Sequence, residues 1–332
     1  MSQAQTRRSF LSMTALAGAA GLLSPPALGT EERLETTTVR FQKSPLCNSS
    51  IFYIAEEMLR AEGFTEIRYI DAPEAGSIRP VFHGEADFSP AYANQCDRAI
   101  DAGEPLMLLA GLMVGCFDLF AREGIDSVAG LKGKSIGVGA AGSLSQELLT
   151  LITAQVGLDS VKDVQWVTDP SVKPIELFMK GKVDAFLGLP FEPQDLRARH
   201  IGHVILDTAV DRPWSQYFCC ILAGNREFVA RHPVATKRVM RAILTATDLC
   251  ATEPAAAAQQ LADRGLTPRY DYAFQTLSEN GYKWREYDAE DTIRFYALRL
   301  RDVGLIKSTP QKIIADGTDW RFLNELKREL KA

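Results

Sequence analysis

Short apolar runs alternate with longer amphipathic stretches along most of the chain. Residues 37–41, 107–112 and 164–167 are short and rich in β-branched or bulky apolar residues, which is typical of strands. Over residues 144–156, by contrast, apolar residues recur every three or four positions, which predicts a helix that buries one face. Because the two patterns alternate, we expect an α/β fold with mostly parallel sheets and flanking helices.

The same reasoning assigns the other elements. The predicted strands are residues 37–41, 66–70, 86–89, 107–112, 116–121, 135–138, 164–167, 184–187, 204–206 and 218–223. The predicted helices are residues 51–62, 77–82, 144–156, 172–179, 192–200, 234–250, 254–264, 288–303 and 320–330, and residues 90–95 are predicted to open a loop and a further helix.

One stretch, residues 131–156, combines a strand, a glycine-rich turn and a helix N-terminus. Gly137, Gly139 and Gly142 allow the backbone to turn tightly after the strand. Ser143 or Ser145 then offers a side chain that can cap the helix. Backbone N–H groups at a helix N-terminus attract acceptor atoms of a ligand. The turn is therefore either a ligand contact or an ordinary connection between a strand and a helix.

A short motif occurs once in each half of the chain. Residues 84–87 read Gly-Glu-Ala-Asp and residues 181–184 read Gly-Lys-Val-Asp, and each motif leads into a strand and then a loop with proline and an aromatic residue. The repeat predicts two similar lobes whose loops meet at the carboxyl ends of their sheets, where open α/β folds bind ligands. Residues 117–120 and 218–223 are the predicted crossings between the lobes, so we expect a hinge there.

Composition narrows the function. The chain has 332 residues, 46% hydrophobic and 24% charged, with a formal net charge of −5. An acidic balance argues against nucleic acid as a partner, because phosphate binding needs a basic surface. The six cysteines include no Cys-x-x-Cys pair, so the spacing typical of zinc or iron–sulfur sites is absent. We expect no metal site and no dense set of disulfides.

The N-terminus has the features of an export signal. Residues 6–11, Thr-Arg-Arg-Ser-Phe-Leu, precede an apolar run at residues 13–23, and residues 27–29 offer a cleavage site. The paired arginines predict a twin-arginine signal peptide over residues 1–29. A general secretory signal that happens to contain two arginines is the alternative. The apolar run is short for a membrane span, so we expect a mature periplasmic protein that starts near Thr30.

Four motifs together resemble a known family. They are Leu-Lys-Gly-Lys-Ser-Ile-Gly-Val at residues 131–138, Gly-Ser-Leu-Ser at 142–145, Gly-Lys-Val-Asp-Ala at 181–185 and Phe-Glu-Pro at 191–193. The chain resembles the periplasmic substrate-binding proteins of ABC transporters, in the SsuA/THI5 (NMT1-like) group. That group includes sulfonate, taurine and nitrate binders and thiamine-pyrimidine proteins.

The resemblance implies a two-lobed type II periplasmic-binding-protein fold with a hinge between the lobes. Residues 30–118 and 222–332 would form lobe I, and residues 119–221 would form lobe II. The implied partners are a small-molecule ligand and the membrane permease subunits of an ABC importer, and the implied state is a monomer without a cofactor. The implied ligand-binding residues are Ser44, Asn48, Ser49, Ser89, Tyr92, Gly142, Ser143, Leu144, Ser145, Pro190, Phe191 and Glu192.

Each implied residue has a physical role. Hydroxyl and backbone N–H groups satisfy ligand oxygens without a buried counter-charge, and Tyr92 with Phe191 can hold a flat or apolar body between them. Glu192 either accepts a hydrogen bond from the ligand or caps a helix. The basic candidates for an anion site are Lys43, Arg79 and Arg122, and none of them lies in the Gly142 turn.

Aromatic residues favour another ligand class. Phe117, Trp214 and Tyr217, together with Phe191, suggest an aromatic-walled cleft. We therefore expect a small organic ligand with a ring or an apolar part, such as a sulfonate, an aromatic acid or a pyrimidine-like compound.

Other functions remain as alternatives. The first is an enzyme similar to the thiamine-pyrimidine synthases, which use a histidine and a cysteine cluster with iron; here Cys219-Cys220 lies on an apolar run where cysteine is a common core residue. The second is a binding protein that docks on a sensor. Residues 137–142 also match Gly-x-Gly-x-x-Gly, but the acidic partner would be Asp159 in a polar turn. We expect a binding protein without catalytic residues.

Overall fold

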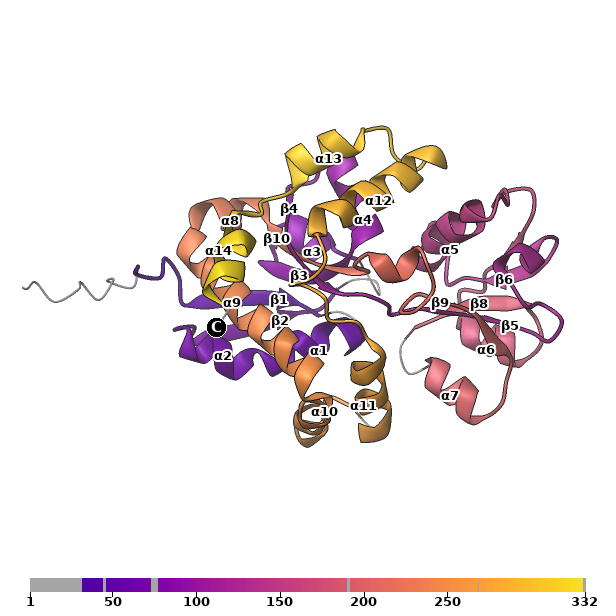
Figure 1. The fold of residues 1–332 in the computed structure, drawn as a ribbon, viewed down its shortest axis with the longest axis horizontal. Helices are drawn as coiled ribbons and strands as arrows, with labels where there is room; N and C mark the ends of the chain where they lie inside the picture. Colours follow the sequence, from indigo (N-terminus) through magenta and orange to yellow (C-terminus); the bar gives the residue numbers. More distant parts are fainter. Residues whose placement is uncertain (1–31, 44–45, 73–76, 190–191, 268, 331–332) are drawn as a thin grey trace, which may run out of the picture. The chain divides into compact units, whose positions relative to one another are not determined.

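The computed structural model describes residues 32–43, 46–72, 77–189, 192–267 and 269–330 (Figure 1). Residues 34–332 form one compact unit. The strands are β1 Thr38–Gln42, β2 Glu66–Ile70, β3 Phe88–Tyr92, β4 Leu106–Met113, β5 Asp118–Ala121, β6 Ser135–Gly137, β7 Gln165–Val167, β8 Ala185–Gly188, β9 His203–Asp207 and β10 Cys220–Asn225. The helices are α1 Leu46–Ile54, α2 Glu56–Ala61, α3 Arg79–Phe82, α4 Ala93–Asp101, α5 Leu144–Gln155, α6 Pro174–Met179, α7 Glu192–Ala198, α8 Arg226–Arg231, α9 Pro233–Thr252, α10 Pro254–Asp263, α11 Tyr270–Glu279, α12 Ala289–Asp302, α13 Pro310–Gly317 and α14 Arg321–Glu329, with short 3-10 turns at Val128–Leu131 and Trp214–Gln216.

The strands form two five-stranded sheets with the same plan. The first has the order β2-β1-β3-β10-β4, and the second has the order β7-β6-β8-β5-β9. In each sheet one strand, β10 or β5, pairs antiparallel with both of its neighbours, and the other pairs are parallel. We call the first sheet with its helices lobe I and the second sheet with α5, α6 and α7 lobe II. The two sheets are mixed but mostly parallel, as the sequence predicts.

The chain passes between the lobes twice, and each crossing ends within the range predicted for it, residues 117–120 or 218–223, the remainder of which lies in β5 or β10. The outward crossing joins β4 to β5 through residues 114–117, and the return crossing joins β9 to β10 through residues 208–219. The crossings contact each other: the Phe117 N–H donates to Thr208 Oγ1 at 3.1 Å, and the Cys219 N–H donates to the Met113 carbonyl at 2.9 Å. These two adjacent segments of the chain form the hinge between the lobes. The exact residue boundaries of the lobes stay a prediction.

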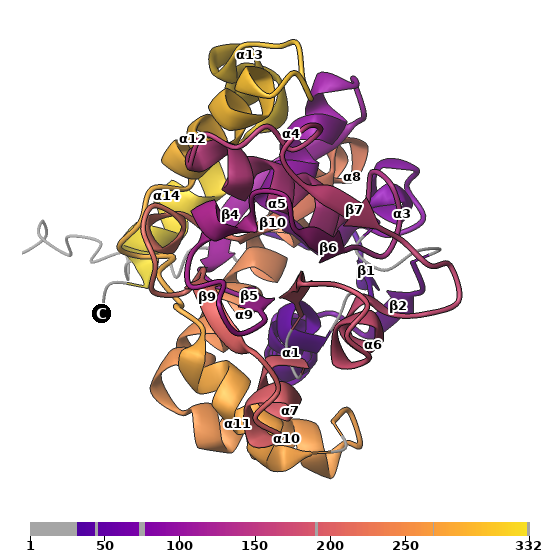
Figure 2. The same cartoon turned by 90° about the vertical axis from the view of Figure 1, so that its right-hand side faces the viewer.

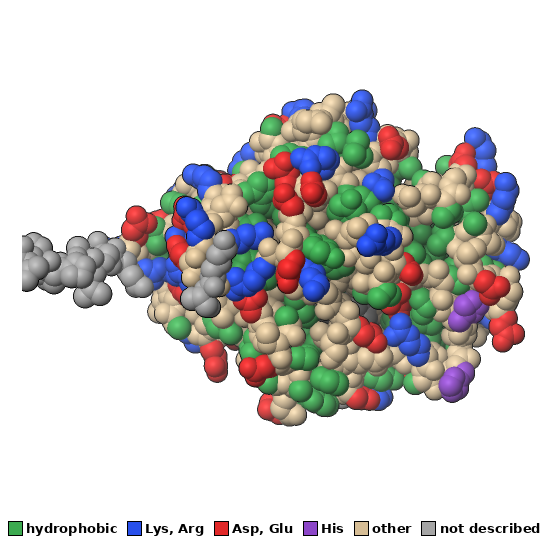
Figure 3. All heavy atoms as spheres, viewed as in Figure 1, with side chains coloured by type: hydrophobic (Ala, Val, Ile, Leu, Met, Phe, Trp, Pro, Cys, Tyr) green, Lys and Arg blue, Asp and Glu red, His purple; other side chains and the backbone are tan. Residues whose placement is uncertain are grey.

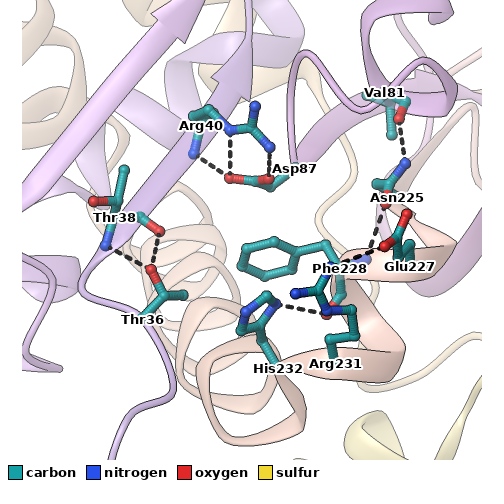
Figure 4. Close-up of polar contacts among 10 residues, drawn as sticks. All are labelled: Thr36, Thr38, Arg40, Val81, Asp87, Asn225, Glu227, Phe228, Arg231 and His232. Atoms are coloured by element: carbon teal, nitrogen blue, oxygen red, sulfur yellow. Dashed lines mark hydrogen bonds and ion pairs between the residues drawn. The ribbon is translucent and has the colours of Figure 1, made fainter.

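The repeated Gly-x-x-Asp motif has the same structural role in both lobes. The Asp87 carboxylate accepts from the Arg40 backbone N–H at 2.7 Å and from its guanidinium, as Figure 4 shows. The Asp184 carboxylate accepts from the Ser135 backbone N–H at 2.8 Å and from its hydroxyl at 2.7 Å. Each aspartate ties the start of one strand, β3 or β8, to the parallel strand beside it, β1 or β6. The motif is therefore an internal repeat of structure.

Aromatic side chains fill the core of each lobe. In lobe I the Phe41 ring lies 4.8 Å from Phe52 between centroids, and in lobe II the Phe178 ring lies 5.1 Å from Phe186. Most of the lobe I helices follow β10 in sequence. Helices α4, α12 and α13 pack together (Figure 1), and α10 packs against α11 (Figure 2). Among the described residues, no helix has both the length and the apolar content that a membrane span requires.

Strand β3 differs from the sequence prediction. It continues through Pro90 to Tyr92, although proline predicts a loop there. The Ala93 N–H donates to the Cys219 carbonyl, just before β10, at 3.0 Å. Because backbone groups alternate in direction along a strand, the Pro90 nitrogen faces away from β10, toward β1. On that side β1 pairs with β3 only at Phe88. Proline is tolerated at position 90 because β1, the strand that would have accepted a hydrogen bond from this position, no longer pairs with β3 there. Strand β3 therefore continues to Tyr92, which lies at its end.

Helices account for the other differences. The predicted helix at residues 51–62 begins earlier, at Leu46, and is broken into α1 and α2 at Ala55. Helix α4 follows the predicted loop at residues 90–95, as expected. Helices α8, α11 and α13 have no counterpart among the predicted helices, because each spans ten residues or fewer and shows its period over few turns.

Candidate ligand-binding site

The N-terminus of α5 is built as the sequence predicts. Ser143 is the residue before the helix, and its hydroxyl accepts from the Gln146 N–H at 3.5 Å. The Gln146 side chain in turn accepts from the Gly142 N–H at 2.6 Å, which resembles a reciprocal capping arrangement. Gly142 has a φ of +73°, a conformation that favours glycine. The turn therefore fixes the half-buried side chains of Ser143, Leu144 and Ser145 at the positive end of the helix.

Two aromatic rings lie opposite this helix N-terminus. Tyr92 ends β3 of lobe I, and Phe117 lies on the outward crossing. Their ring centroids are 5.2 Å apart with an interplanar angle of 40°. Only 1% of the Tyr92 surface and 4% of the Phe117 surface is exposed, so both rings are held by their surroundings. This pair forms an apolar wall of fixed position.

The helix terminus and the aromatic pair line one cavity of about 180 Å³. This is smaller than the roughly 300–1,000 Å³ of typical ligand pockets, so the cavity admits a small ring. The lining is mostly apolar and comes from both lobes. Its described residues are Tyr92, Phe117, Gly139, Ser143, Leu144, Ser145, Pro174, Leu187, Leu189 and Glu192.

Glu192 supplies the carboxyl group of the cavity. It is the first residue of α7, and its carboxyl accepts from the Leu189 N–H at 2.9 Å. Burial raises the pKa of Glu192, and this backbone hydrogen bond opposes the shift. Glu192 therefore holds Leu189 close to the start of α7 and also borders the cavity.

Two of the three basic residues considered for an anion site, Lys43 and Arg122, have other contacts. Lys43 pairs with Asp71 at 2.7 Å. Arg122 donates to the carbonyls of Val183 and Phe178, and its guanidinium lies over the Phe178 ring, so it holds lobe II together. No lysine, arginine or histidine is found among the described residues that line the cavity. On the face drawn in Figure 3, basic and acidic side chains are interspersed.

The cavity brings together five of the predicted site residues: Tyr92, Ser143, Leu144, Ser145 and Glu192. Sequence reasoning missed Gly139, Pro174, Leu187 and Leu189 as lining residues. Leu187 and Leu189 flank the end of β8, just before the Phe-Glu-Pro motif. The position of this motif directly after a strand could have indicated that the end of the strand also lines the cavity.

Other predicted residues lie elsewhere. Ser89 is fully buried within β3, and its hydroxyl donates to the Pro90 carbonyl at 3.2 Å. Gly142 shapes the turn but does not line the cavity. Asn48 and Ser49 lie inside α1, because this helix begins at Leu46, and nothing is described of their side chains. Ser44, Pro190 and Phe191 fall outside the described residues.

The wider aromatic wall expected from Trp214 and Tyr217 is not part of the cavity lining. The Tyr217 ring stacks on Phe295 of α12 at 3.8 Å, and Trp214 packs edge-on against the same ring at 5.6 Å. Both rings pack on the apolar face of α12. This helix lies far from Trp214 and Tyr217 in sequence, so the local pattern does not reveal the contact. Of the described aromatic residues named for the cleft, Phe117 and Tyr92 line it.

Comparison with known proteins places the chain among two-lobed folds. Residues 60–257 match the family model described as NMT1/THI5-like. The chain is similar to the periplasmic nitrate-binding protein NrtA from Synechocystis PCC 6803, with a TM-score of 0.74, 14% identity and 90% of each chain covered. It is also similar to the alkanesulfonate-binding protein SsuA from Xanthomonas axonopodis pv. citri bound to MOPS, with a TM-score of 0.68, 17% identity, and 87% of this chain and 100% of that one covered.

The aliphatic sulphonate-binding protein SsuA from Escherichia coli is similar as well, with a TM-score of 0.66, 17% identity, and 84% of this chain and 91% of that one covered. No curated protein matches the chain in sequence. At these identities the likeness concerns the fold. The predicted two-lobed type II periplasmic-binding-protein fold is thereby confirmed, as is the predicted group.

Proposed function

The chain belongs to the NMT1/THI5-like family, and on this premise we propose that it is a periplasmic solute-binding protein of an ABC importer. It binds a small organic molecule between its lobes and presents it to the membrane permease. The observation that carries the proposal is the cavity of about 180 Å³ that lobe I and lobe II line together. A ligand held by both sides of a hinge stabilises the closed arrangement, which a permease can distinguish from the open one.

The lining supports an uncharged or cationic ring compound as the ligand. Tyr92 and Phe117 provide apolar faces, the hydroxyls of Ser143 and Ser145 serve as donors or acceptors, and Glu192 is the acidic group. A sulfonate or carboxylate in this cavity would be desolvated beside a carboxyl group, with no basic side chain among the described lining residues to offset its charge. An N–H donor on the ring would instead pair with Glu192.

Export places this binding site outside the cytoplasm. The twin-arginine motif supports this part of the proposal, and residues 1–31 lie outside the described residues. The enzyme alternative, a thiamine-pyrimidine synthase-like activity, is tested by metal analysis, because stoichiometric iron in the purified protein would favour it over a binding protein.

A thermal-shift comparison tests the ligand class. An aminopyrimidine, benzoate and an alkanesulfonate of similar size are added to the protein, and we expect the aminopyrimidine to raise the melting temperature most, because a ligand that binds the native state stabilises it. If the sulfonate alone raised the melting temperature, the proposed ligand class would be wrong, while a binding protein would remain supported. If none of a broad set of small solutes bound, the binding function itself would be in doubt.

Substitutions then locate the site. We expect Tyr92→Ala to weaken calorimetric binding of whichever probe binds by about 1–3 kcal/mol through loss of aromatic contact. Leu144→Ala is a second test for the case in which Tyr92→Ala does not fold. Tyr270→Ala is the matched control, since Tyr270 is 40% exposed and stacks on Phe274 instead of lining the cavity. Unchanged affinity in both site variants would contradict the proposed site.

A further inference from the structure

Three cysteines from distant parts of the sequence meet at the hinge. Cys116 lies on the outward crossing, Cys219 ends the return crossing, and Cys220 begins β10. The sulfur of Cys220 lies 3.8 Å from that of Cys116 and 3.3 Å from that of Cys219, and all three sulfurs lie within 4.8 Å of one another. We call these residues the thiol cluster. The proposed ligand-binding function does not use them.

The thiol cluster is enclosed by protein. Cys116 is 8% exposed, Cys219 is 6% exposed and Cys220 is fully buried. Cys116 has a φ of +86°, which is uncommon for a residue other than glycine and costs backbone energy. The fold therefore holds Cys116 in a conformation that brings its side chain to the other two thiols.

The hydroxyl group of Tyr296 lies close to the cluster. Burial raises the pKa of Tyr296 on α12, and negative charge on each of the three cysteines raises it further. The Arg299 guanidinium acts on the same hydroxyl in the opposite direction.

One residue of the thiol cluster, Cys116, borders a small cavity with acidic lining residues. Cys116 lines a cavity of about 30 Å³ together with the carboxyl groups of Asp118, Asp207 and Glu279. This cavity is large enough for about one water molecule, so it also admits a single dehydrated metal ion.

We propose that Cys116, Cys219 and Cys220 form a binding site for one copper(I) ion, held by three sulfurs at the hinge. Each sulfur that binds the ion releases its proton to the solvent. Copper keeps its +1 oxidation state, so binding requires neither an oxidant nor a reductant. The site is formed only when both crossings are in place, because the outward crossing supplies one sulfur and the return crossing with β10 supplies two.

The donor set favours copper(I) over other metals. Thiolate sulfur selects soft ions such as copper(I), whereas magnesium, calcium and manganese prefer oxygen ligands. Zinc in a structural site takes four ligands, and among the described residues the cluster contains three. A metal–thiolate bond of about 2.3 Å, the length of a zinc–thiolate bond, places three sulfurs around a trigonal ion about 4 Å apart. The sulfur distances in the cluster therefore need little change.

A competition titration tests the site. The full chain is reduced, kept without oxygen and titrated with copper(I) against bicinchoninate, a chromophoric copper(I) chelator. We expect one equivalent to be withheld from the chelator, with a sulfur-to-copper charge-transfer absorption. Cys116→Ser, Cys219→Ser and Cys220→Ser should each weaken binding by about 100-fold or more, beyond the roughly 10–100-fold cost of losing an outer-shell partner.

Cys96→Ser and Cys250→Ser are the matched controls, because both residues are buried thiols outside the cluster. We expect both controls to bind copper(I) as the original chain does. If a cluster variant does not fold, X-ray absorption at the copper edge of the unsubstituted chain still decides, and three sulfur neighbours are expected. The proposal is overturned if copper(I) is not withheld, if binding persists in the triple serine variant, or if nitrogen or oxygen dominates the copper shell. Recovery of the chain from cells with a disulfide within the cluster would also overturn it.

Discussion

Two contacts between helices of lobe I and helices of lobe II differ in how they accommodate buried carboxyl groups. In the contact between α4 and α5, the Glu147 carboxylate is 5% exposed and accepts from the Asn94 amide at 2.6 Å and from the Arg98 guanidinium at 2.5 Å. In the contact between α7 and α11, the Arg197 guanidinium pairs with Asp118 at 2.5 Å and with Glu279 at 3.3 Å.

The difference lies in the number of acidic groups for each donor. Asp97 also lies near Glu147, but burial, with a smaller effect from the Glu147 charge, raises the pKa of Asp97 well above its ordinary value. The α4–α5 contact thus holds one charged carboxylate with two donors. At the α7–α11 contact, Asp118 lies directly opposite Asp207 on neighbouring strands, so Arg197 faces three carboxyl groups with Glu279 included.

The comparison shows that donors outnumber the charged carboxylate in the α4–α5 contact, whereas carboxyl groups outnumber the single guanidinium in the α7–α11 contact. Burial raises the pKa of Asp118 to about 7, although the Arg197 guanidinium opposes this shift. Burial also raises the pKa of Asp207. We therefore expect the α4–α5 contact to stabilise the fold by a large amount, and the α7–α11 contact to change with pH in the physiological range.

The largest effect is expected from Glu147→Ala. This change removes the acceptor of a buried amide and the partner of Arg98, and we expect unfolding to become easier by about 2–4 kcal/mol. Urea unfolding at pH 7 measures the change. Glu123→Ala is the matched control, because Glu123 is exposed. A loss of stability below about 0.5 kcal/mol, the range of ordinary surface changes, would contradict the large stabilisation expected from the α4–α5 contact.

A smaller, pH-dependent effect is expected from Asp118→Asn. The folded pKa of about 7 lies above the ordinary 3.8, so between these values the native state holds a proton that the unfolded chain has released. Stability from this group therefore falls as pH rises through that window and is constant above it. Relative to the original chain, the asparagine variant should gain about 2 kcal/mol or more from pH 4 to pH 7.

Urea unfolding of both proteins across this pH range measures that gain. Asp302→Asn, at an exposed position, should follow the original chain at every pH. Parallel curves for Asp118→Asn and the original chain would mean that the Asp118 carboxyl titrates in its usual range, and the contrast between the two contacts would then rest on hydrogen bonds alone.

The smallest effect is expected from Gln155→Ala, at the far end of α5. The Gln155 side chain accepts from Arg299 at 3.1 and 3.2 Å, but this is an exposed contact between the lobes. Arg299 also lies over the Phe295 ring at 3.5 Å and keeps that contact in the variant. We expect a change within about 0.5 kcal/mol. A loss above about 1 kcal/mol in urea unfolding would mean that exposed contacts share the role given to Glu147.

Local signals in the sequence predicted the fold and part of the site. The apolar run of β6, the glycine turn and the cap Ser143 are all encoded within a few residues, so the position of α5 could be predicted. The aspartates of the repeated motif likewise marked equivalent strands in the two lobes. Tyr92 was found because it follows such an aspartate in the same lobe.

Contacts between the crossings could not be predicted in the same way. Cys116 and Cys220 meet only because the chain returns across the hinge after completing lobe II, and nothing near either residue signals this approach. The sequence therefore suggested no metal site. Asp118 and Glu279 come together for the same reason, since α11 follows β5 by a long stretch of chain and its helix was not predicted.

The position of β10 in its sheet has a consequence for biosynthesis. All strands of lobe II lie between Asp118 and Asp207, whereas β10, which lies between β3 and β4, ends at Asn225. A nascent chain can thus assemble the second half-molecule while the first still lacks a central strand. Lobe I therefore begins to be translated first but completes its sheet last. Until β10 is inserted, the edges of β3 and β4 can pair with strands of other polypeptides in the cell.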